Sequence, residues 1–332
     1  MINLFTPIND HKLILKNRLV MPPLATKKGN DDGSVSLDIL NYYQKLSEDS
    51  IISLIIIEHS YINIEGKLSL KQLGIDNDLK IESFTKLNNI IENNNTKAIV
   101  QLTHAGSARK LESDFIIKSA SNITHPVAKI TPNAMSKEDI KKIINDFVSA
   151  AIRVEKAGFY GVQLHSAHGY LLNQFLSPLT NQRTDEYGGN SYNRIRIHLE
   201  IINQLKKVLN PKTIISIRLG FIDGYNNGIT MDDIIIACKE FEKANVDILD
   251  ISAGFNGFIK PYTDNFGYFK DITKAISKIV KTKVILTGGI KTLKEANYLL
   301  NNGYADLIGV GTSQYKDPKW AKKTYLESIK YD

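Results

Sequence analysis

Residues 283–312 read KVILTGGIKTLKEANYLLNNGYADLIGVGT, and this stretch decides the fold. It begins with a short run of β-branched and aliphatic residues, Val284–Leu286, and ends with a similar run, and glycines follow both. Between them, Thr292 and Glu295 form a capping-box pattern that opens a helix, and Gly303 ends it. A strand, a helix and a second strand in this order predict one parallel β–α–β unit.

The same alternation of strand and helix continues along the whole chain. Continuous apolar runs such as Leu54–Ile57 are typical of parallel strands that are covered on both faces. The predicted strands are Arg18–Met21, Ser53–Glu58, Lys97–Leu102, Gly161–His165, Ile214–Leu219, Ile248–Ile251, Val284–Leu286 and Leu307–Val310. Eight strands with intervening helices predict an α/β fold that closes into a (β/α)₈ TIM barrel.

The chain has 332 residues, which suits one such barrel of about 250 residues with insertions. No proline-rich or glycine/serine-rich linker divides it, so we expect a single domain over residues 1–332. The segments Ser166–Asn190 and Thr103–Asn133 are long and polar, and each follows a strand. In a barrel that position places them over the active-site face.

Composition excludes several classes of protein. Net charge is +7, but the basic residues are scattered, and we expect no nucleic-acid partner. The single cysteine, Cys238, excludes disulfides and iron–sulfur clusters, and it fits the apolar face of a helix. No leader-like segment and no apolar run of membrane-spanning length is present, which predicts a cytoplasmic protein that acts on a small molecule.

Polar residues and glycines recur at the carboxyl ends of the predicted strands, where a barrel builds its site. They are His59-Ser60, Gln101, His165 to Tyr170, Arg218, Ser252, Thr287-Gly288-Gly289 and Gly309-Val310-Gly311. Glycine allows backbone N–H groups to approach an anion closely, and the loops after strands seven and eight are the usual phosphate site of this fold. The alternative for each glycine pair is a tight turn without a ligand.

His165 and His168 are three residues apart, with Tyr170 two residues further on. No third ligand stands nearby in the motif, so we expect no metal site. Two imidazoles could instead donate hydrogen bonds to one oxygen and polarise a carbonyl, and the phenol of Tyr170 could deliver a proton. Two buried structural histidines are the alternative.

Gln101 and Arg218 complete the candidate site. An amide can pair with the donor and acceptor edge of a heterocycle, and a fixed guanidinium can offset negative charge that appears on reduction. For Arg218 the alternative is an ion pair within the rim of the barrel.

These residues resemble the Old Yellow Enzyme family of FMN-dependent ene-reductases and NAD(P)H:flavin oxidoreductases, nearly end to end. The motifs that carry the resemblance are Lys16–Met21 with Pro23, Gln101–Gly106, His165–Leu172, Phe175–Pro178, Asn181, Arg183–Gly189 and Ala305–Ile308.

The resemblance implies one FMN across the barrel mouth, which NADH or NADPH reduces before the flavin passes a hydride to an activated C=C bond or another small acceptor. His165 and His168 would bind the acceptor's carbonyl oxygen, and Tyr170 would protonate its Cα and contact it, with Lys27 as a further contact. The cofactor-binding residues would be Pro23, Leu24, Ala25, His59, Gln101, Arg218, Gly288, Gly289, Gly311 and Thr312.

Four positions depart from the family pattern. Ala25 stands where some relatives have a cysteine near the flavin, and Lys27 stands where an aromatic residue is frequent. Thr312 replaces an arginine that clamps the phosphate, a loss for which Lys27 could compensate. His59 stands where a small residue is common, so it would press on the flavin or donate to it.

Three other functions remain as alternatives. A dihydrouridine synthase would need a catalytic cysteine and a helical RNA-binding domain. An aldolase-type barrel would need a Schiff-base lysine at a strand end, for which Lys27 is the only candidate. A non-catalytic flavin-binding stress protein would keep the same site. Assembly into a homo-oligomer is left open, because relatives range from monomers to tetramers.

Overall fold

The structure is a computed structural model that describes residues 2–111, 114–255, 257 and 265–330. Its centre is a closed barrel of parallel strands in the order β10-β11-β12-β3-β4-β5-β8-β9. The barrel strands are β3 Leu19–Met21, β4 Leu54–Tyr61, β5 Lys97–Thr103, β8 Gly161–Ser166, β9 Ile214–Ile222, β10 Ile248–Ala253, β11 Lys283–Thr287 and β12 Leu307–Gly309. All eight predicted strands are therefore confirmed, and so is the TIM-barrel fold.

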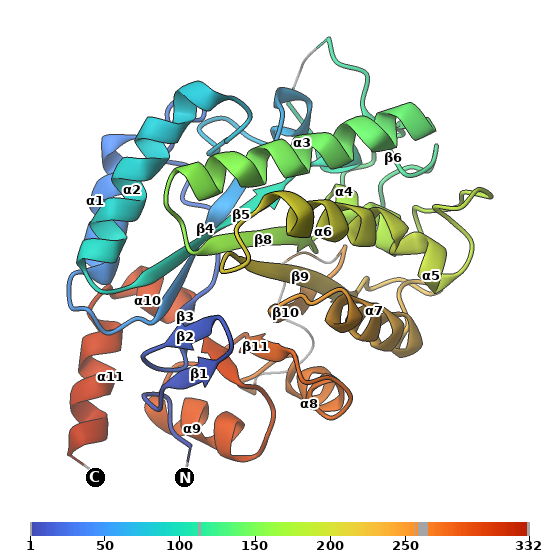
Figure 1. The fold of residues 1–332 in the computed structure, drawn as a ribbon. Coiled ribbons are helices and arrows are strands. Elements are labelled where there is room, and N and C mark those ends of the chain that lie inside the picture. Colours follow the sequence, from blue (N-terminus) through green and yellow to red (C-terminus); the bar gives the residue numbers. More distant parts are fainter. Residues whose placement is uncertain (1, 112–113, 256, 258–264, 331–332) are drawn as a thin grey trace.

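Helices cover the outside of the barrel, as Figure 1 shows for α2, α3, α6 and α7. The α-helices are α1 Leu37–Ser47, α2 Ile81–Asn93, α3 Lys137–Lys156, α4 Leu171–Leu176, α5 Ser191–Arg194, α6 Arg196–Val208, α7 Met231–Lys243, α8 Lys270–Ser277, α9 Leu293–Asn301, α10 Thr312–Lys316 and α11 Trp320–Ile329. Short 3₁₀ turns are η1 Ile64–Gly66, η2 Asp78–Lys80 and η3 Gly106–Ala108, and β6 Lys118–Ser119 pairs with β7 Asn133–Ala134. In the part of the chain that the structure describes, no helix has the length and apolarity needed to cross a bilayer.

The helices begin where the sequence predicts. The capping boxes of Ser136 with Asp139, Thr230 with Asp233 and Thr292 with Glu295 are all present, at the first turns of α3, α7 and α9. Each box satisfies backbone N–H groups that would otherwise lack a partner. Cys238 is a buried free thiol on α7, as expected for a core residue.

A hairpin closes the N-terminal end of the barrel. Its strands, β1 Ile8–Asp10 and β2 Leu13–Leu15, pair antiparallel and lie in front of the barrel in Figure 1. The hairpin side chains of Ile8, Leu13 and Leu15 form one buried cluster with the inward residues Val20, Leu54, Ile56, Ile99, Ile214, Ile248, Ile285 and Leu307. The N-terminal half of the barrel is therefore a packed apolar core. The carboxyl ends of the strands are left for the catalytic groups.

Several strands run further toward their carboxyl ends than the sequence predicts. The largest differences are three residues each, in β9, which continues past Leu219 to Ile222, and in β4, which continues past Glu58 to Tyr61. Ile57 pairs with Val100 of β5 but Ser60 pairs with Leu102, so β4 contains one extra residue in this interval. This β-bulge interrupts the period-two pattern from which the strand was predicted.

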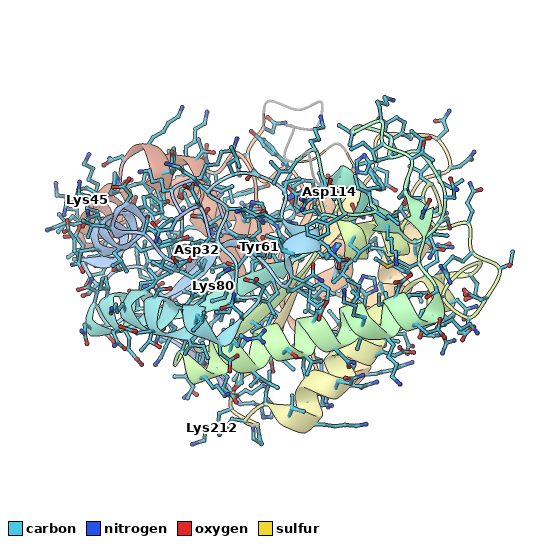
Figure 2. All side chains as sticks on the ribbon, turned by 90° about the horizontal axis from the view of Figure 1, so that it is seen from above. Asp32, Lys45, Tyr61, Lys80, Asp114 and Lys212 are labelled. Atoms are coloured by element: carbon cyan, nitrogen blue, oxygen red, sulfur yellow. The ribbon has the colours of Figure 1, made fainter. Side chains whose placement is uncertain are left out.

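The end of β4 is held in place by Tyr61, whose side chain is buried. Its hydroxyl donates to the Asp32 carbonyl at 2.6 Å and accepts from Lys80 Nζ at 2.9 Å. Figure 2 shows Asp32, Tyr61 and Lys80 close together. A Cβ at Gly74 would lie 2.2 Å from the Tyr61 ring, so the backbone must approach that ring closely. The bulged end of β4 is thus fixed from outside the barrel.

The two segments expected over the active-site face follow β5 and β8 directly, and residues 112–113 of the first lie outside the described residues. The second segment holds α4, whose residues are all buried. It is therefore a packed cover for the barrel mouth.

We expect Leu15→Ala to lower the free energy of unfolding by about 2–5 kcal/mol, because it leaves a cavity between the hairpin and the barrel core. Chemical denaturation followed by circular dichroism measures this. The matched control is Ile14→Ala on the same strand, whose residue is 60% exposed and which should change stability by less than about 0.5 kcal/mol. Equal effects of the two substitutions would contradict the role given to the hairpin.

Candidate active site

A cavity of about 470 Å³ opens at the carboxyl ends of the strands. Residues from both glycine segments, from the end of β3 and from β9 line it together. Of the predicted site residues these are Pro23, Leu24, Arg218, Gly288, Gly289, Gly311 and Thr312. The structure therefore brings together groups that are almost 300 positions apart in the sequence.

Two of these positions require glycine, because their backbone has a positive φ and because the ring of Tyr268 lies close to them. Gly288 and Gly289 have φ values of +107° and +69°, in the region that side chains rarely adopt. A Cβ at either position would also lie 2.7 Å and 2.5 Å, respectively, from the ring of Tyr268. The bare backbone of this segment is thus exposed to the cavity, where its N–H groups can meet an anion.

Four aromatic rings gather beside this cavity. The His165 ring centroid lies 5.0 Å from that of His168 and 4.9 Å from that of Tyr170, both edge to face. His59 lies 6.4 Å from His165 and is parallel to Tyr170 at 5.8 Å. The predicted pair of histidines and the predicted proton donor are therefore close enough to contact one small molecule.

The cavity and the ring cluster adjoin each other at Ser252 and Arg218. Ser252 lines the cavity, and its Oγ lies 2.8 Å from His168 Nε2. Arg218 also lines the cavity, and it pairs with His165 in the register of β8 and β9. A ligand that fills the cavity therefore continues toward the rings.

His168 stands on a strained turn. Its φ is +62°, which is unfavourable for a residue with a side chain, and the following Gly169 has φ +73°. The turn is fixed by hydrogen bonds from Gly169 N to Asn173 Oδ1 at 2.8 Å and from Gln174 Nε2 to the Gly169 carbonyl at 2.7 Å. This explains how β8 can present both His165 and His168 to the same space.

Burial controls the protonation of these groups. It lowers the pKa of His165 well below its usual range, with the neighbouring His168 and Arg218 acting in the same direction. Burial, with Arg218 next, also lowers the pKa of His168 far below the usual range. Burial raises the pKa of Tyr170 to about 12. At neutral pH the site thus holds two neutral imidazoles and a protonated phenol.

A buried polar network lies beneath the rings, inside the barrel. Gln101 Nε2 donates to Gln163 Oε1 at 2.8 Å, and Gln163 Nε2 donates to Ser216 Oγ and to Asp250 Oδ2. Arg218 Nε lies 3.3 Å from Asp250 Oδ2, so the buried guanidinium has a counter-charge. Burial raises the pKa of Asp250, and Arg218 opposes that shift. The ion pair at the barrel rim that was the alternative for Arg218 is therefore present. The same side chain also lines the cavity, so the ion pair does not exclude a role toward a ligand.

Other histidines have structural roles. His125 Nδ1 accepts from the N–H groups of Val127 and Ala128, so its Nε2 donates to the Gly169 carbonyl at 2.9 Å. His104 Nδ1 accepts from Gly106 N at 3.0 Å. His198 on α6 is fully buried, with Nε2 2.8 Å from Ser166 Oγ. They support the loops around the site and do not belong to it.

Two predicted residues lie apart from the cavity. Ala25 and Lys27 are exposed and are not among the residues that line it, and Lys27 has φ +56°. Lys291 and Lys316 line it instead, near Thr312. The cations that line the cavity therefore come from the segments after β11 and β12, whereas the predicted Lys27 follows β3.

Sequence reasoning also missed Gln163, Asp250 and Gln72. Gln163 and Asp250 are polar residues at inward positions of otherwise apolar strands, and that contrast could have identified them. Gln72 lies in a loop, and only its contact with His59 reveals it. Within residues 2–111, 114–255, 257 and 265–330, no group of three or more His, Cys, Asp or Glu side chains could hold a metal ion.

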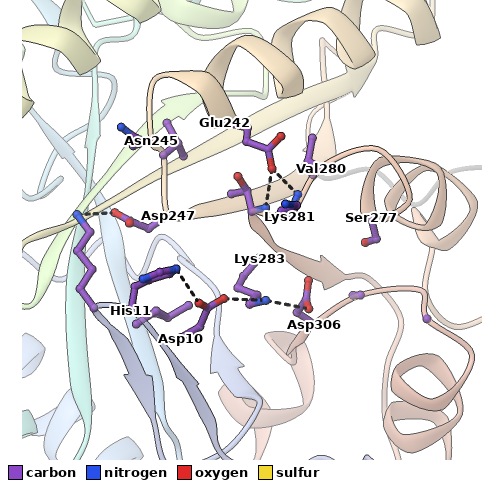
Figure 3. A pocket seen from close by; sticks show the side chains of 16 residues that line it. Asp10, His11, Glu242, Asn245, Asp247, Ser277, Val280, Lys281, Lys283 and Asp306 are labelled. Carbon is purple, nitrogen blue, oxygen red and sulfur yellow. Dashed lines mark hydrogen bonds and ion pairs between the residues drawn. The ribbon is translucent and has the colours of Figure 1, made fainter.

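A larger hollow of about 1080 Å³ lies at the opposite end of the barrel, beside the hairpin (Figure 3). Its charged groups pair with one another: Lys283 Nζ lies 2.9 Å from Asp10 Oδ2, and Lys12 Nζ lies 3.0 Å from Asp247 Oδ2. Its size alone does not make it the site, because a TIM barrel builds its site at the carboxyl ends of the strands and this hollow lies at the other end.

Comparison with known proteins gives a family match over almost the whole chain. Residues 3–328 match the model of the NADH:flavin oxidoreductase / NADH oxidase family. An NADPH dehydrogenase of Bacillus cytotoxicus is 36% identical over 317 residues, which cover 95% of this chain and 90% of that protein. An NADH oxidase of Thermoanaerobacter brockii is 33% identical over 328 residues, which cover 97% of this chain but only 50% of that protein.

Solved structures share the fold. Morphinone reductase in complex with tetrahydroNAD superposes with a TM-score of 0.84 at 24% identity, over 98% of this chain and 91% of that one. A 2-naphthoyl-CoA reductase complex gives a TM-score of 0.91 at 22% identity, over 98% of this chain and 52% of that one. At these identities the likeness supports the barrel fold alone.

We expect the imidazoles of His165 and His168 not to titrate between pH 5.5 and 8. Because burial lowers both pKa values, the neutral forms persist through this range and protons bind only at lower pH. NMR of ¹³C-histidine-labelled protein measures this, with signals assigned from the His165→Ala and His168→Ala spectra. A histidine peptide in the same buffer, which titrates at about pH 6.5, is the control. A midpoint near 6.5 for either residue would contradict the assignment.

Proposed function

The chain belongs to the NADH:flavin oxidoreductase / NADH oxidase family, and from this we propose how its site works as an FMN-dependent NAD(P)H oxidoreductase. The function is the transfer of a hydride from NADH or NADPH through FMN to an activated C=C bond or another small oxidised acceptor. The observation that carries the proposal is the junction of the glycine-lined cavity with the ring cluster through Ser252 and Arg218.

The residues present fit FMN. The cavity of about 470 Å³ has bare glycine backbone at one side, where a Cβ would strike Tyr268, and Arg218 at another. The N–H groups of Gly288, Gly289 and Gly311 would hold the phosphate, with Lys291 and Lys316 supplying the positive charge that Thr312 lacks. Pro23 and Leu24 would supply apolar contact. Bound FMN supplies the redox chemistry, because a flavin accepts a hydride from a nicotinamide and donates one to an electron-poor carbon.

Gln101 would recognise the cofactor's heterocyclic edge. Its Nε2 already donates to Gln163, so its Oε1 and the second N–H remain for a ligand. Arg218 is positioned by Asp250, and its charge would stabilise negative charge on the reduced cofactor.

The acceptor would bind over the rings. Two neutral imidazoles can donate N–H hydrogen bonds to one carbonyl oxygen, which draws electron density from the conjugated double bond. His165 Nδ1 is buried without a partner among the described residues, so the protein leaves hydrogen-bonding capacity unused there. The phenol of Tyr170 keeps its proton at neutral pH and can deliver it to the substrate carbon.

Three other properties belong to this proposal. Residues 1–332 would act as one domain, in the cytoplasm, on a small-molecule acceptor. The exposed Lys27 would contact the acceptor rather than the phosphate, and Ala25 and His59 would lie near the cofactor.

The purified protein should be yellow and should release FMN on denaturation. Anaerobic NADH or NADPH should bleach it, and 2-cyclohexenone should restore the colour, as stopped-flow absorbance would show. A colourless protein that does not take up added FMN would overturn the proposal. Bleaching without reoxidation by any activated alkene would instead favour the non-catalytic flavin protein.

Tyr170→Phe should slow the acceptor half-reaction by at least about 100-fold more than the nicotinamide half-reaction, because only the former needs a proton from the protein. Stopped-flow measurement of each half-reaction tests this. Tyr192→Phe, at a residue that is 56% exposed, is the matched control. Equal loss in both half-reactions would show that Tyr170 shapes the site rather than donating the proton.

A further inference from the structure

The β-bulge in β4 determines which face of the barrel wall the side chain of His59 occupies. Leu54 and Ile56 face the inner apolar cluster, and Ile55 and Ile57 face the outer one. Strict alternation would therefore turn Glu58 inward and His59 outward. The extra residue between Ile57 and Ser60 reverses this order.

The contacts of the two side chains confirm the reversal. Glu58 reaches Thr26 beyond β3, accepting from its N–H at 2.9 Å and from its hydroxyl at 2.7 Å. The His59 ring instead lies at the barrel mouth beside His165 and Tyr170. The bulge thus adds a third imidazole to the acceptor site.

The hydrogen bonds of the Gln72 side chain determine which ring nitrogen of His59 carries the proton. Its Oε1 accepts from Leu68 N at 2.7 Å, which fixes the orientation of the amide, because the reverse orientation would set two N–H groups against each other. Its Nε2 then donates to the His59 carbonyl and to His59 Nδ1, both at 3.2 Å. Since Nδ1 accepts, a neutral His59 must carry its proton on Nε2.

His59 is neutral and its Nε2 is unused. Burial lowers the pKa of His59 to about 4, and the charge of Lys27 adds to that effect. The residue is only 8% exposed, and no described residue accepts a hydrogen bond from Nε2. Nε2 is not among the buried atoms that lack a partner, so it stays open to a ligand at the barrel mouth.

We infer that His59, two strands away from His165 in the barrel, is a third hydrogen-bond donor to the acceptor beside the pair of His165 and His168, and that Gln72 positions it by fixing its tautomer. The inference rests on the proposed function and deepens it. A site with a third donor on a separate strand favours a flat acceptor that carries a second oxygen on its activated double bond, such as a maleimide or a quinone. A simple enone has only one oxygen and leaves His59 unpaired.

Substitution of His59 should change selectivity. The ratio of kcat/KM for maleimide to kcat/KM for 2-cyclohexenone should fall roughly tenfold in His59→Phe, which keeps a ring of similar bulk but loses the donor. Gln72→Glu should lower the ratio similarly, because a carboxylate draws the proton onto Nδ1. Leu70→Ala in the same loop, at a residue that is 72% exposed, should leave the ratio unchanged.

The tautomer has a direct readout that does not depend on turnover. In ¹⁵N–¹H correlation spectra the wild-type His59 should show the Nε2–H pattern, and Gln72→Glu should lose it. Gln72→Asn, too short to reach Nδ1, should show a mixture of tautomers. An Nδ1–H pattern in the wild type would overturn the role of Gln72.

The outcomes separate this inference from the proposed function. If the wild type reduces neither maleimide nor 2-cyclohexenone, the proposed function fails. If it reduces both and His59→Phe leaves the ratio unchanged, the inference is wrong. A shift of the flavin absorbance maxima in His59→Phe with an unchanged ratio would assign His59 to the cofactor instead, and would equally overturn it.

Discussion

Closure of eight parallel strands is the constraint on which the site depends. In a closed barrel each strand is paired on both edges, so its register is fixed by two neighbours at once. That register places His165 beside Arg218, and Arg218 beside Asp250. One strand slipped by a single residue would turn its polar side chain to the outer surface and leave its partner buried alone. The hairpin that fills the N-terminal end allows the polar groups to concentrate at the other end.

The polar side chains of the barrel mouth are buried, and this burial governs their chemistry. Burial keeps the imidazoles of His59, His165 and His168 neutral, so each offers a directed N–H rather than a charge. Asp250 is placed beneath the buried guanidinium of Arg218 and supplies its counter-charge. Hydrogen bonds in such surroundings are stronger than in water, and unpaired donors are correspondingly costly. The arrangement therefore favours ligands that bring complementary oxygens.

Much of the fold follows from local pattern. Apolar runs predict the strands, and capping boxes at Thr230 and Thr292 predict where helices begin, because these features involve residues close together in the chain. The rule that barrel sites lie at carboxyl ends then selects His165, His168, Tyr170 and the glycines correctly as neighbours. The rule does not say which cation would compensate for the arginine replaced by Thr312. Lys291 and Lys316 line the cavity in the structure, and Lys27 does not.

The sequence by itself thus determined the barrel, the family and the residue types at the strand ends, since periodicity, turn chemistry and motif spacing are properties of the linear chain. Only the tertiary structure decided which polar groups meet. The bulge that turns His59 inward, the reach of Gln72 to its Nδ1 and the pairing of Arg218 with Asp250 all depend on registers between distant segments. Those registers join segments that are far apart in the chain, and no single stretch of sequence contains that information.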